Sequence, residues 1–172
     1  MLELTTKRLI LRPIQITDDD ILHQAIFDDV EVMRFSDGRQ TKAWVRAWID
    51  SQAEQYQQRG YGAYAIVEKQ DQGVTGYCGL FYFPDVNGQP EVEIGYRLAR
   101  SAWGNGYATE AASAVRDYAL TALGMKRLIA IIDPSNIASI RVAEKIGMRY
   151  EQDVMFEGYS HPDHVYALHQ TG

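Results

Sequence analysis

Two short segments of the sequence carry residues whose types and spacing suit the binding of a phosphorylated group. The first, Trp103-Gly104-Asn105-Gly106-Tyr107-Ala108-Thr109-Glu110, places two glycines between a strand-like run and a helix-like run. Such a loop turns several backbone N–H groups toward one point at a helix N-terminus, where they can receive phosphate. The second, Asn136-Ile137-Ala138-Ser139, begins another helix after an apolar strand. Together they predict a protein that holds a phosphorylated cofactor and performs chemistry beside it.

Two common phosphate-binding motifs do not fit the first segment. A dinucleotide fingerprint requires a third small residue at the position that Thr109 occupies, within a βαβ repeat. A nucleoside-triphosphate loop requires Gly-Lys-Ser/Thr, and the segment holds no lysine. The glycine loop taken alone is equally typical of a plain helix-entry turn, in which glycine only satisfies the backbone geometry.

Several short segments of the sequence resemble motifs of the GNAT N-acetyltransferase superfamily. Gly106 and Ala108 fit the second half of its pyrophosphate loop, R/Q-x-x-G-x-G/A. The surrounding segments resemble the branch typified by the RimJ/RimL ribosomal-protein N-terminal acetyltransferases. In chain order these segments are 6–13 (TKRLILRP), 29–35 (DVEVMRF), 93–96 (EIGY), 103–111 (WGNGYATEA) and 136–148. The resemblance therefore extends from about residue 4 to about residue 168.

The resemblance implies an α+β protein with the GNAT fold, in which a central, mostly antiparallel twisted sheet carries helices on both faces. It implies acetyl-CoA as co-substrate. The residues expected to bind acetyl-CoA are Tyr96, Leu98, Trp103, Gly104, Asn105, Gly106, Tyr107, Ala108, Thr109 and Asn136. Trp103 departs from the Arg or Gln of the family loop, so the anion site must depend more on backbone donors. Arg100 and Lys145 are candidates for phosphate contacts or for solvated surface positions.

Two catalytic roles follow from the resemblance. Glu93 matches the Glu of the Glu-Ile-Gly-Tyr motif in this branch and is the candidate general base, acting directly or through water. Glu91 lies on the same strand face and is its rival. The superfamily's usual acid, a tyrosine seven residues after Asn136, is replaced by Ala143. Ser139 stands where the RimJ/RimL-like branch carries a serine, and the resemblance makes it the candidate proton or hydrogen-bond donor to the departing thiolate, with helix capping as its alternative role.

The expected reaction is transfer of acetyl from acetyl-CoA to a primary amine. An α-amine with a pKa near 7.8 loses its proton more easily than a lysine with a pKa near 10.4, a difference of about 3.5 kcal/mol. A protein N-terminal α-amine is therefore the leading acceptor. The alternatives are a small-molecule amine, such as an amino acid, polyamine or antibiotic, and a non-catalytic acyl-CoA-binding regulatory module. The acceptor pocket is expected to involve the first two helices and residues 153–164, with Phe35, Tyr82 and His161 as candidates.

Composition agrees with a single globular domain over residues 1–172. A net charge of -6 argues against direct nucleic-acid binding, which favours basic surfaces. No apolar run approaches the roughly 20 residues that span a bilayer, and the N-terminus lacks a signal-peptide pattern. The lone Cys78 fits a small residue in a strand and a reducing compartment. We therefore expect a cytoplasmic protein without a metal and without a membrane partner; a homo-oligomer is compatible with the sequence.

The pattern of apolar and turn residues predicts a mixed series of elements. Strands are expected at 8–12 (an edge strand ending at Pro13), 61–68, 76–82, 91–98, 128–132 and within 159–168. Helices are expected at 21–28 after three aspartates, from Thr41 with an apolar stripe, at 109–122, and from Asn136 to Gly147. Turns are expected at 71–73 and 88–90.

Overall fold

The computed structural model describes residues 2–170, and within them eight strands form one sheet in the order β1-β2-β3-β4-β5-β6-β8-β7. The strands are β1 (Leu4–Thr5), β2 (Leu9–Pro13), β3 (Ala63–Glu68), β4 (Val74–Val86), β5 (Gln89–Leu98), β6 (Arg127–Ile132), β7 (Arg149–Val154) and β8 (Asp163–His169). In this part of the chain every neighbouring pair is antiparallel except β5 and β6, which are parallel. The expected α+β architecture with a mostly antiparallel sheet is confirmed.

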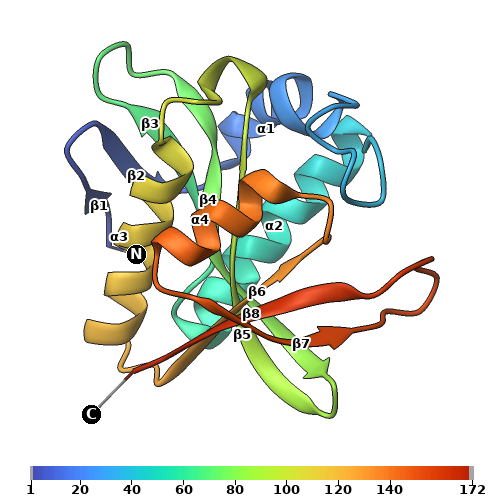
Figure 1. The fold of residues 1–172 in the computed structure, drawn as a ribbon. Helices are drawn as coiled ribbons and strands as arrows, with labels where there is room; N and C mark the ends of the chain where they lie inside the picture. Colours follow the sequence, from blue (N-terminus) through green and yellow to red (C-terminus); the bar gives the residue numbers. More distant parts are fainter. Residues whose placement is uncertain (1, 171–172) are drawn as a thin grey trace.

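Helices cover both faces of the sheet, as expected. They are η1 (Ile16–Asp18), α1 (Asp19–Leu22), η2 (His23–Phe27), α2 (Lys42–Arg59), η3 (Arg100–Ala102), α3 (Tyr107–Thr121) and α4 (Ile137–Lys145). Figure 1 shows α3 and α4 in front of the sheet and α1 and α2 behind it. Within residues 2–170, no helix is both long enough and apolar enough to cross a membrane.

The ends of the longer helices follow from local chemistry. The Thr41 hydroxyl accepts the Trp44 N–H at 3.2 Å and caps the start of α2, as the sequence predicts. Gly60 follows α2 with a φ of 79°, a left-handed conformation that favours glycine. The helix α4 is likewise capped, because the Asn136 side chain accepts the Ser139 N–H at 3.2 Å, and Gly147 follows it with a φ of 91°.

Two apolar clusters hold the helices to the sheet. One lies between the sheet and the α3–α4 layer and includes Ile94, Val115 and Ala143, each with at most 1% of its surface exposed. The other joins η2 and α2 to β4, and in it the ring of Phe27 stacks on Tyr77 at 5.7 Å. The site described below lies where these layers meet β5 and β6.

Three expectations about single elements are corrected by the structure. The helix expected at 21–28 is divided into η1, α1 and η2. It starts earlier, at Ile16, where Asp18 accepts the Gln15 N–H at 2.8 Å and also binds Arg12 through two hydrogen bonds of 2.6 and 2.8 Å. The strand β2 is not an edge strand, since β1 pairs with it. The strand β7 was not expected, because most of its side chains are exposed and show no apolar alternation.

Candidate active site

The parallel strands β5 and β6 separate along their length. They pair at one position, with Glu93 opposite Ile129. Toward their carboxyl ends, β5 continues to pair with β4 as far as Leu98, and β6 continues to pair with β8 as far as Ile132. The facing edges of residues 95–98 and 130–132, here called the open seam, are therefore left without strand-to-strand pairing. An extended ligand chain can form backbone hydrogen bonds to such an edge.

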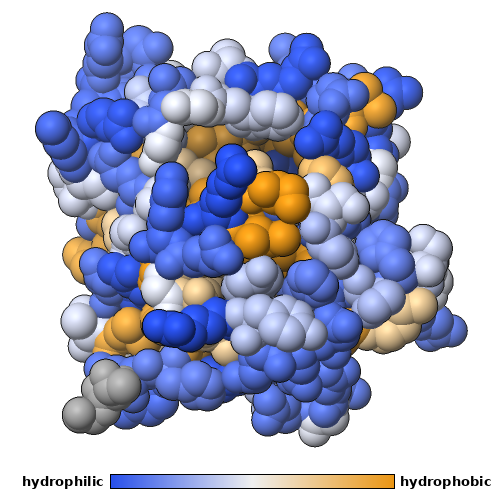
Figure 2. Space-filling view, in the orientation of Figure 1, coloured by the Kyte–Doolittle hydropathy of each residue, from blue (hydrophilic) through white to orange (hydrophobic). Residues whose placement is uncertain are grey.

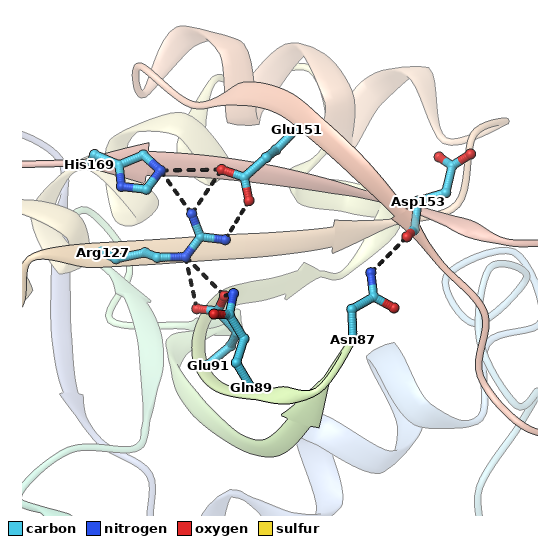
Figure 3. A network of polar contacts seen from close by, with 7 residues as sticks. All are labelled: Asn87, Gln89, Glu91, Arg127, Glu151, Asp153 and His169. Carbon is cyan, nitrogen blue, oxygen red and sulfur yellow. Dashed lines mark hydrogen bonds and ion pairs between the residues drawn. The ribbon is translucent and has the colours of Figure 1, made fainter.

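An ion-pair network around Arg127 closes the opposite end of the same two strands. The Glu91 carboxylate, with 4% of its surface exposed, accepts hydrogen bonds from Arg127 Nε at 2.9 and 3.1 Å. Arg127 also binds Glu151 on β7 at 2.6 Å, and His169 on β8 lies 3.2 Å from Glu151. Figure 3 shows these residues gathered around the Arg127 guanidinium. The guanidinium lowers the pKa of Glu151 to about 2. Glu91 is thus engaged in holding the strands together.

Glu93 lies between this network and the open seam. Its Oε1 atom accepts the Ile131 N–H at 3.1 Å, which bridges β5 to β6. Its Oε2 atom lies above Gly95, since a Cβ there would approach it to 3.5 Å. Burial raises the pKa of Glu93 to about 7, although the Ile131 N–H and the Arg97 guanidinium partly offset this effect. A carboxyl with a pKa close to neutral can accept and release protons at physiological pH.

The glycine loop presents unused backbone donors at the start of α3. Gly104 and Gly106 have φ values of 76° and 78°, and Gly106 is the N-cap residue without a side-chain cap. Within the described chain, no acceptor binds the N–H groups of residues 104–109. The Trp103 indole donates to the Leu98 carbonyl at 2.8 Å, which ties the loop to the end of β5. Consecutive free N–H groups at a helix N-terminus favour a phosphate ligand, so the loop fits the diphosphate of a coenzyme A group.

Arg8 also lies at this loop, and the sequence interpretation did not include it. Its Nη1 donates to the Asn105 carbonyl at 2.8 Å, its guanidinium pairs with Glu110 at 2.7 Å, and it lies 4.6 Å from the centre of the Tyr107 ring. About a hundred residues separate Arg8 from the loop, so spacing gave no signal. Arg100, in contrast, pairs with Asp29 at 3.1 Å.

The first turn of α4 lies beside β5. The Tyr96 hydroxyl donates to the Ser139 carbonyl at 3.1 Å, which fixes the start of α4 relative to the strand. Asn136, and not Ser139, caps this helix. The Ser139 hydroxyl itself forms no hydrogen bond with any described residue, and Ala143 is buried in the core. The capping alternative for Ser139 is therefore wrong, and its hydroxyl is available to a ligand.

The face of the sheet that carries Glu93 is bordered by two loops. The Tyr159 hydroxyl, from the β7–β8 loop, donates to Asp37, from the η2–α2 loop, at 3.1 Å. In the β7–β8 loop, His161 lies 3.4 Å from Asp133. Within residues 2–170, Asp133, His161 and Asp163 form the one group whose ligand atoms lie within 4.8 Å of each other, as metal ligands would. The Tyr159–Asp37 contact thus brings the loop after the first helices and the 153–164 segment together.

Two of the other acceptor candidates have different surroundings. Phe35 lies under the Arg34 guanidinium at 4.5 Å, in the η2–α2 loop. Tyr82 lies under Arg59 at 3.4 Å and packs on the cluster of the α3–α4 face. Its neighbour Phe81, which pairs with Glu93, packs on the opposite face. Tyr82 therefore does not share the face of Glu93.

The surface of the α3–α4 side carries apolar side chains around α4. Figure 2 shows this apolar surface near the middle of the face, surrounded by hydrophilic residues. Ile137, at the start of α4, has 51% of its surface exposed. An apolar border of this kind suits the alkyl part of a long ligand that reaches from the glycine loop to the open seam.

Comparisons with known proteins agree with this geometry. Residues 8–149 match the family model described as "Acetyltransferase (GNAT) domain". The uncharacterized protein YkkB of Bacillus subtilis (strain 168) is 38% identical over 154 residues, which cover 88% of each chain. The crystal structure of an acetyltransferase from Agrobacterium tumefaciens str. C58 is 28% identical, with a TM-score of 0.84, and covers 99% of this chain and 95% of the other.

The expected branch is represented among similar solved structures. RimL, the ribosomal L7/L12 alpha-N-protein acetyltransferase, solved in complex with Coenzyme A, is 18% identical with a TM-score of 0.80 and covers 98% of both chains. At this identity the likeness concerns the fold. The expected GNAT fold is confirmed, and RimL shares this fold.

Proposed function

The chain belongs to the acetyltransferase (GNAT) family, and we propose that it transfers an acetyl group from acetyl-CoA to a primary amine, with a protein N-terminal α-amine as the leading acceptor. The observation that carries this proposal is the position of Glu93. Its carboxyl, with a pKa of about 7, lies at the point where β5 and β6 begin to separate. A proton acceptor is thereby located beside an edge to which an extended ligand can bind.

Three groups of residues would hold acetyl-CoA, which supplies an activated acetyl thioester when bound. The backbone N–H groups of residues 104–109 would receive the diphosphate at the positive end of α3. The strand edge at Tyr96 and Leu98 would pair with the pantetheine arm. The Asn136 side chain uses its oxygen for the helix cap, so its amide N–H groups remain for that arm.

Glu93 would remove the proton that the acceptor amine must lose. Anchoring of Oε1 by Ile131 fixes the carboxyl, and Oε2 remains as the proton acceptor. The pKa of Glu93 lies within roughly one unit of an α-ammonium group and more than three units below a lysine ammonium group. Proton transfer from an α-amine is therefore nearly balanced, whereas transfer from lysine is strongly uphill. This difference supports an α-amine, or an amine of similar acidity, as acceptor.

Ser139 would donate a hydrogen bond to the departing thiolate. Its hydroxyl has no partner among residues 2–170, and the Tyr96 contact holds its backbone beside the seam. A thiol with a pKa near 8.5 is a good leaving group, so one hydrogen bond is sufficient assistance. The usual tyrosine is not required for this step.

Release of coenzyme A thiol in the presence of a panel of amines tests the proposal. The panel contains short peptides with free and blocked N-termini, amino acids, diamines and polyamines. Thiol release that depends on a free α-amine supports the proposed acceptor, and release with only diamines or polyamines supports the small-molecule alternative. Tight binding of acetyl-CoA without release by any amine would contradict the proposal and favour a regulatory module.

A further inference from the structure

Arg97 carries a positive charge on the same face of β5 as Glu93, four residues further along the strand. Its side chain is half-buried, and it pairs in register with Tyr77 of β4. Its Nη1 donates to the Met33 sulfur at 2.9 Å. In the described part of the chain, no carboxylate lies within 4.0 Å of its guanidinium, whereas the nearby Arg100 pairs with Asp29.

The guanidinium is left with unused donors in this position. Arginine has five N–H donors in a fixed planar arrangement, and a thioether is a weak acceptor. Polar groups withdrawn from bulk water normally have hydrogen-bond partners. A planar pair of free N–H groups matches a carboxylate, which can accept both at once.

The surroundings of Arg97 include Glu93 and the β7–β8 loop, which the proposed acceptor would contact. Gly95 separates it from Glu93, and the Phe81 ring lies against Gly95, where a Cβ would approach the ring to 2.9 Å. Burial raises the pKa of Glu93, and the Arg97 charge partly offsets that rise. Burial also raises the pKa of Tyr159, and the Arg97 charge partly offsets this rise too. The guanidinium is therefore close enough to influence both the candidate base and the β7–β8 loop.

Carboxyl groups lie across the seam from Arg97, where Asp133 follows the end of β6 and Asp163 starts β8. Burial and the neighbouring Asp133 raise the pKa of Asp163, which itself raises the pKa of Glu93. These three carboxyl groups favour an ammonium group, and Arg97 favours an anion. The site thus carries both signs of charge, with Arg97 on β5 and the carboxyl groups of Asp133 and Asp163 on the β6–β8 side of the seam.

We propose that Arg97 binds a carboxylate of the acceptor, so that the acceptor is a primary amine carrying a carboxylate in the same molecule. This inference rests on the proposed function and names the class of its acceptor. A free amino acid supplies such a carboxylate, and so does a peptide with an acidic residue next to its N-terminus. Both present the same chemistry to Arg97, and the experiment distinguishes them.

The test measures the affinity of acceptors for the full-length protein saturated with coenzyme A, which prevents turnover. Calorimetry compares two matched pairs: an amino acid with its amide, and a peptide with glutamate at its second position with the same peptide carrying glutamine. The variants are Arg97→Gln and Arg97→Lys. Arg149→Gln is the control, because Arg149 is an exposed arginine on β7 that forms no ion pair within residues 2–170.

We expect the wild-type protein to bind the carboxylate member of one pair about 10- to 100-fold more tightly, as one charge-assisted hydrogen-bonded pair provides. Arg97→Gln should abolish this ratio, Arg97→Lys should retain part of it, and Arg149→Gln should leave it unchanged. The same acceptors are used with every variant, so the different pKa values of their amines cancel. Equal affinity for both members of each pair, or equal weakening of both by Arg97→Gln, would overturn the inference. Thiol release with these acceptors separately reports whether the proposed function itself holds.

Discussion

The Glu93 carboxylate accepts the backbone N–H of Ile131 at 3.1 Å, and this bond joins β5 to β6 at the point where the two strands begin to diverge. On one side of it, Glu91 and Arg127 hold the strands together; on the other side lies the open seam. A single acidic side chain thus marks the inner end of the seam and offers one oxygen toward it. This arrangement supports the proposal that Glu93 is the base, because the Glu91 carboxylate is already paired with Arg127.

Glu93→Gln should lower turnover by roughly 10²- to 10⁴-fold, the range for loss of a general base, with little change in acetyl-CoA affinity. Steady-state rates and calorimetry on the same preparation check both quantities. Glu91→Gln is the matched control: it removes a buried hydrogen-bonded carboxylate, so it should lower the free energy of unfolding by about 1–3 kcal/mol while the folded fraction keeps its turnover. If Glu91→Gln abolished turnover and Glu93→Gln did not, the two roles would be reversed.

The rate should depend on pH through the pKa of Glu93. Because the base must be ionised, kcat/KM should rise as the pH passes through about 7 and should lose this step in Glu93→Gln. The loss caused by Glu93→Gln should also shrink at high pH, where more of the amine is already neutral. A pH–rate profile of both proteins from pH 5.5 to about 9 measures this.

The stability of the folded protein should also depend on the ionisation of Glu93, and it should fall as the pH rises. Below pH 4.5 Glu93 is protonated in the folded and unfolded states, and between pH 4.5 and about 7 only the folded state holds the proton. The contribution of Glu93 to stability is therefore lost as the pH rises through this window. Thermal unfolding should show Glu93→Gln gaining stability relative to the wild-type protein between pH 5 and about 8. A constant difference across this range would show that Glu93 has an ordinary pKa.

Ser139→Ala should slow turnover by roughly 10-fold without lowering the melting temperature, because the hydroxyl is not used for capping. Asn136→Ala provides the comparison, since loss of the N-cap should reduce the free energy of unfolding by about 1 kcal/mol. Melting temperatures and single-turnover rates of both variants separate the two effects. An unchanged rate in Ser139→Ala would remove Ser139 from the reaction.

Gly106→Val should weaken acetyl-CoA binding at least about 10-fold, because valine cannot easily adopt a φ of 78° and the loop N–H groups would turn away. The Arg8 guanidinium lies 3.6 Å from the position of the new Cβ, an ordinary contact, so crowding is not the cause. Gly88→Val is the matched control, since Gly88 has a φ of 88° in the β4–β5 turn. Calorimetry should show weaker binding in the first variant alone, and unchanged affinity in a folded Gly106→Val protein would exclude the loop.

Features that depend on local sequence could be predicted. The caps at Thr41 and Asn136, the glycine after α4 and the long apolar strands follow from neighbouring residues. The strand β7 could not be predicted, since an exposed edge strand shows little apolar alternation.

In the candidate site, too, residues within one short segment could be predicted, whereas contacts between distant segments could not. Glu93 and the loop at residues 103–109 lie in short sequence motifs that resemble those of the family. The Arg8–Glu110 pair, the bond from Ile131 to Glu93 and the charge of Arg97 facing Met33 join segments far apart in the chain. Spacing alone carries no signal for such contacts. The preference for Glu93 over Glu91 as the proposed base also required the structure, because Arg127, the partner of Glu91, lies 36 residues away in the sequence.

The most direct test of the account is mass spectrometry of an acceptor mixture incubated with acetyl-CoA and either the wild-type protein or Glu93→Gln. The mixture contains the free and N-terminally blocked peptides and the small amines used for thiol release. The account predicts that the wild-type protein adds one acetyl group to acceptors with a free amine, α-amines above all, and that Glu93→Gln adds far less in the same time. A mixture left unmodified by a folded wild-type protein that binds acetyl-CoA would contradict it.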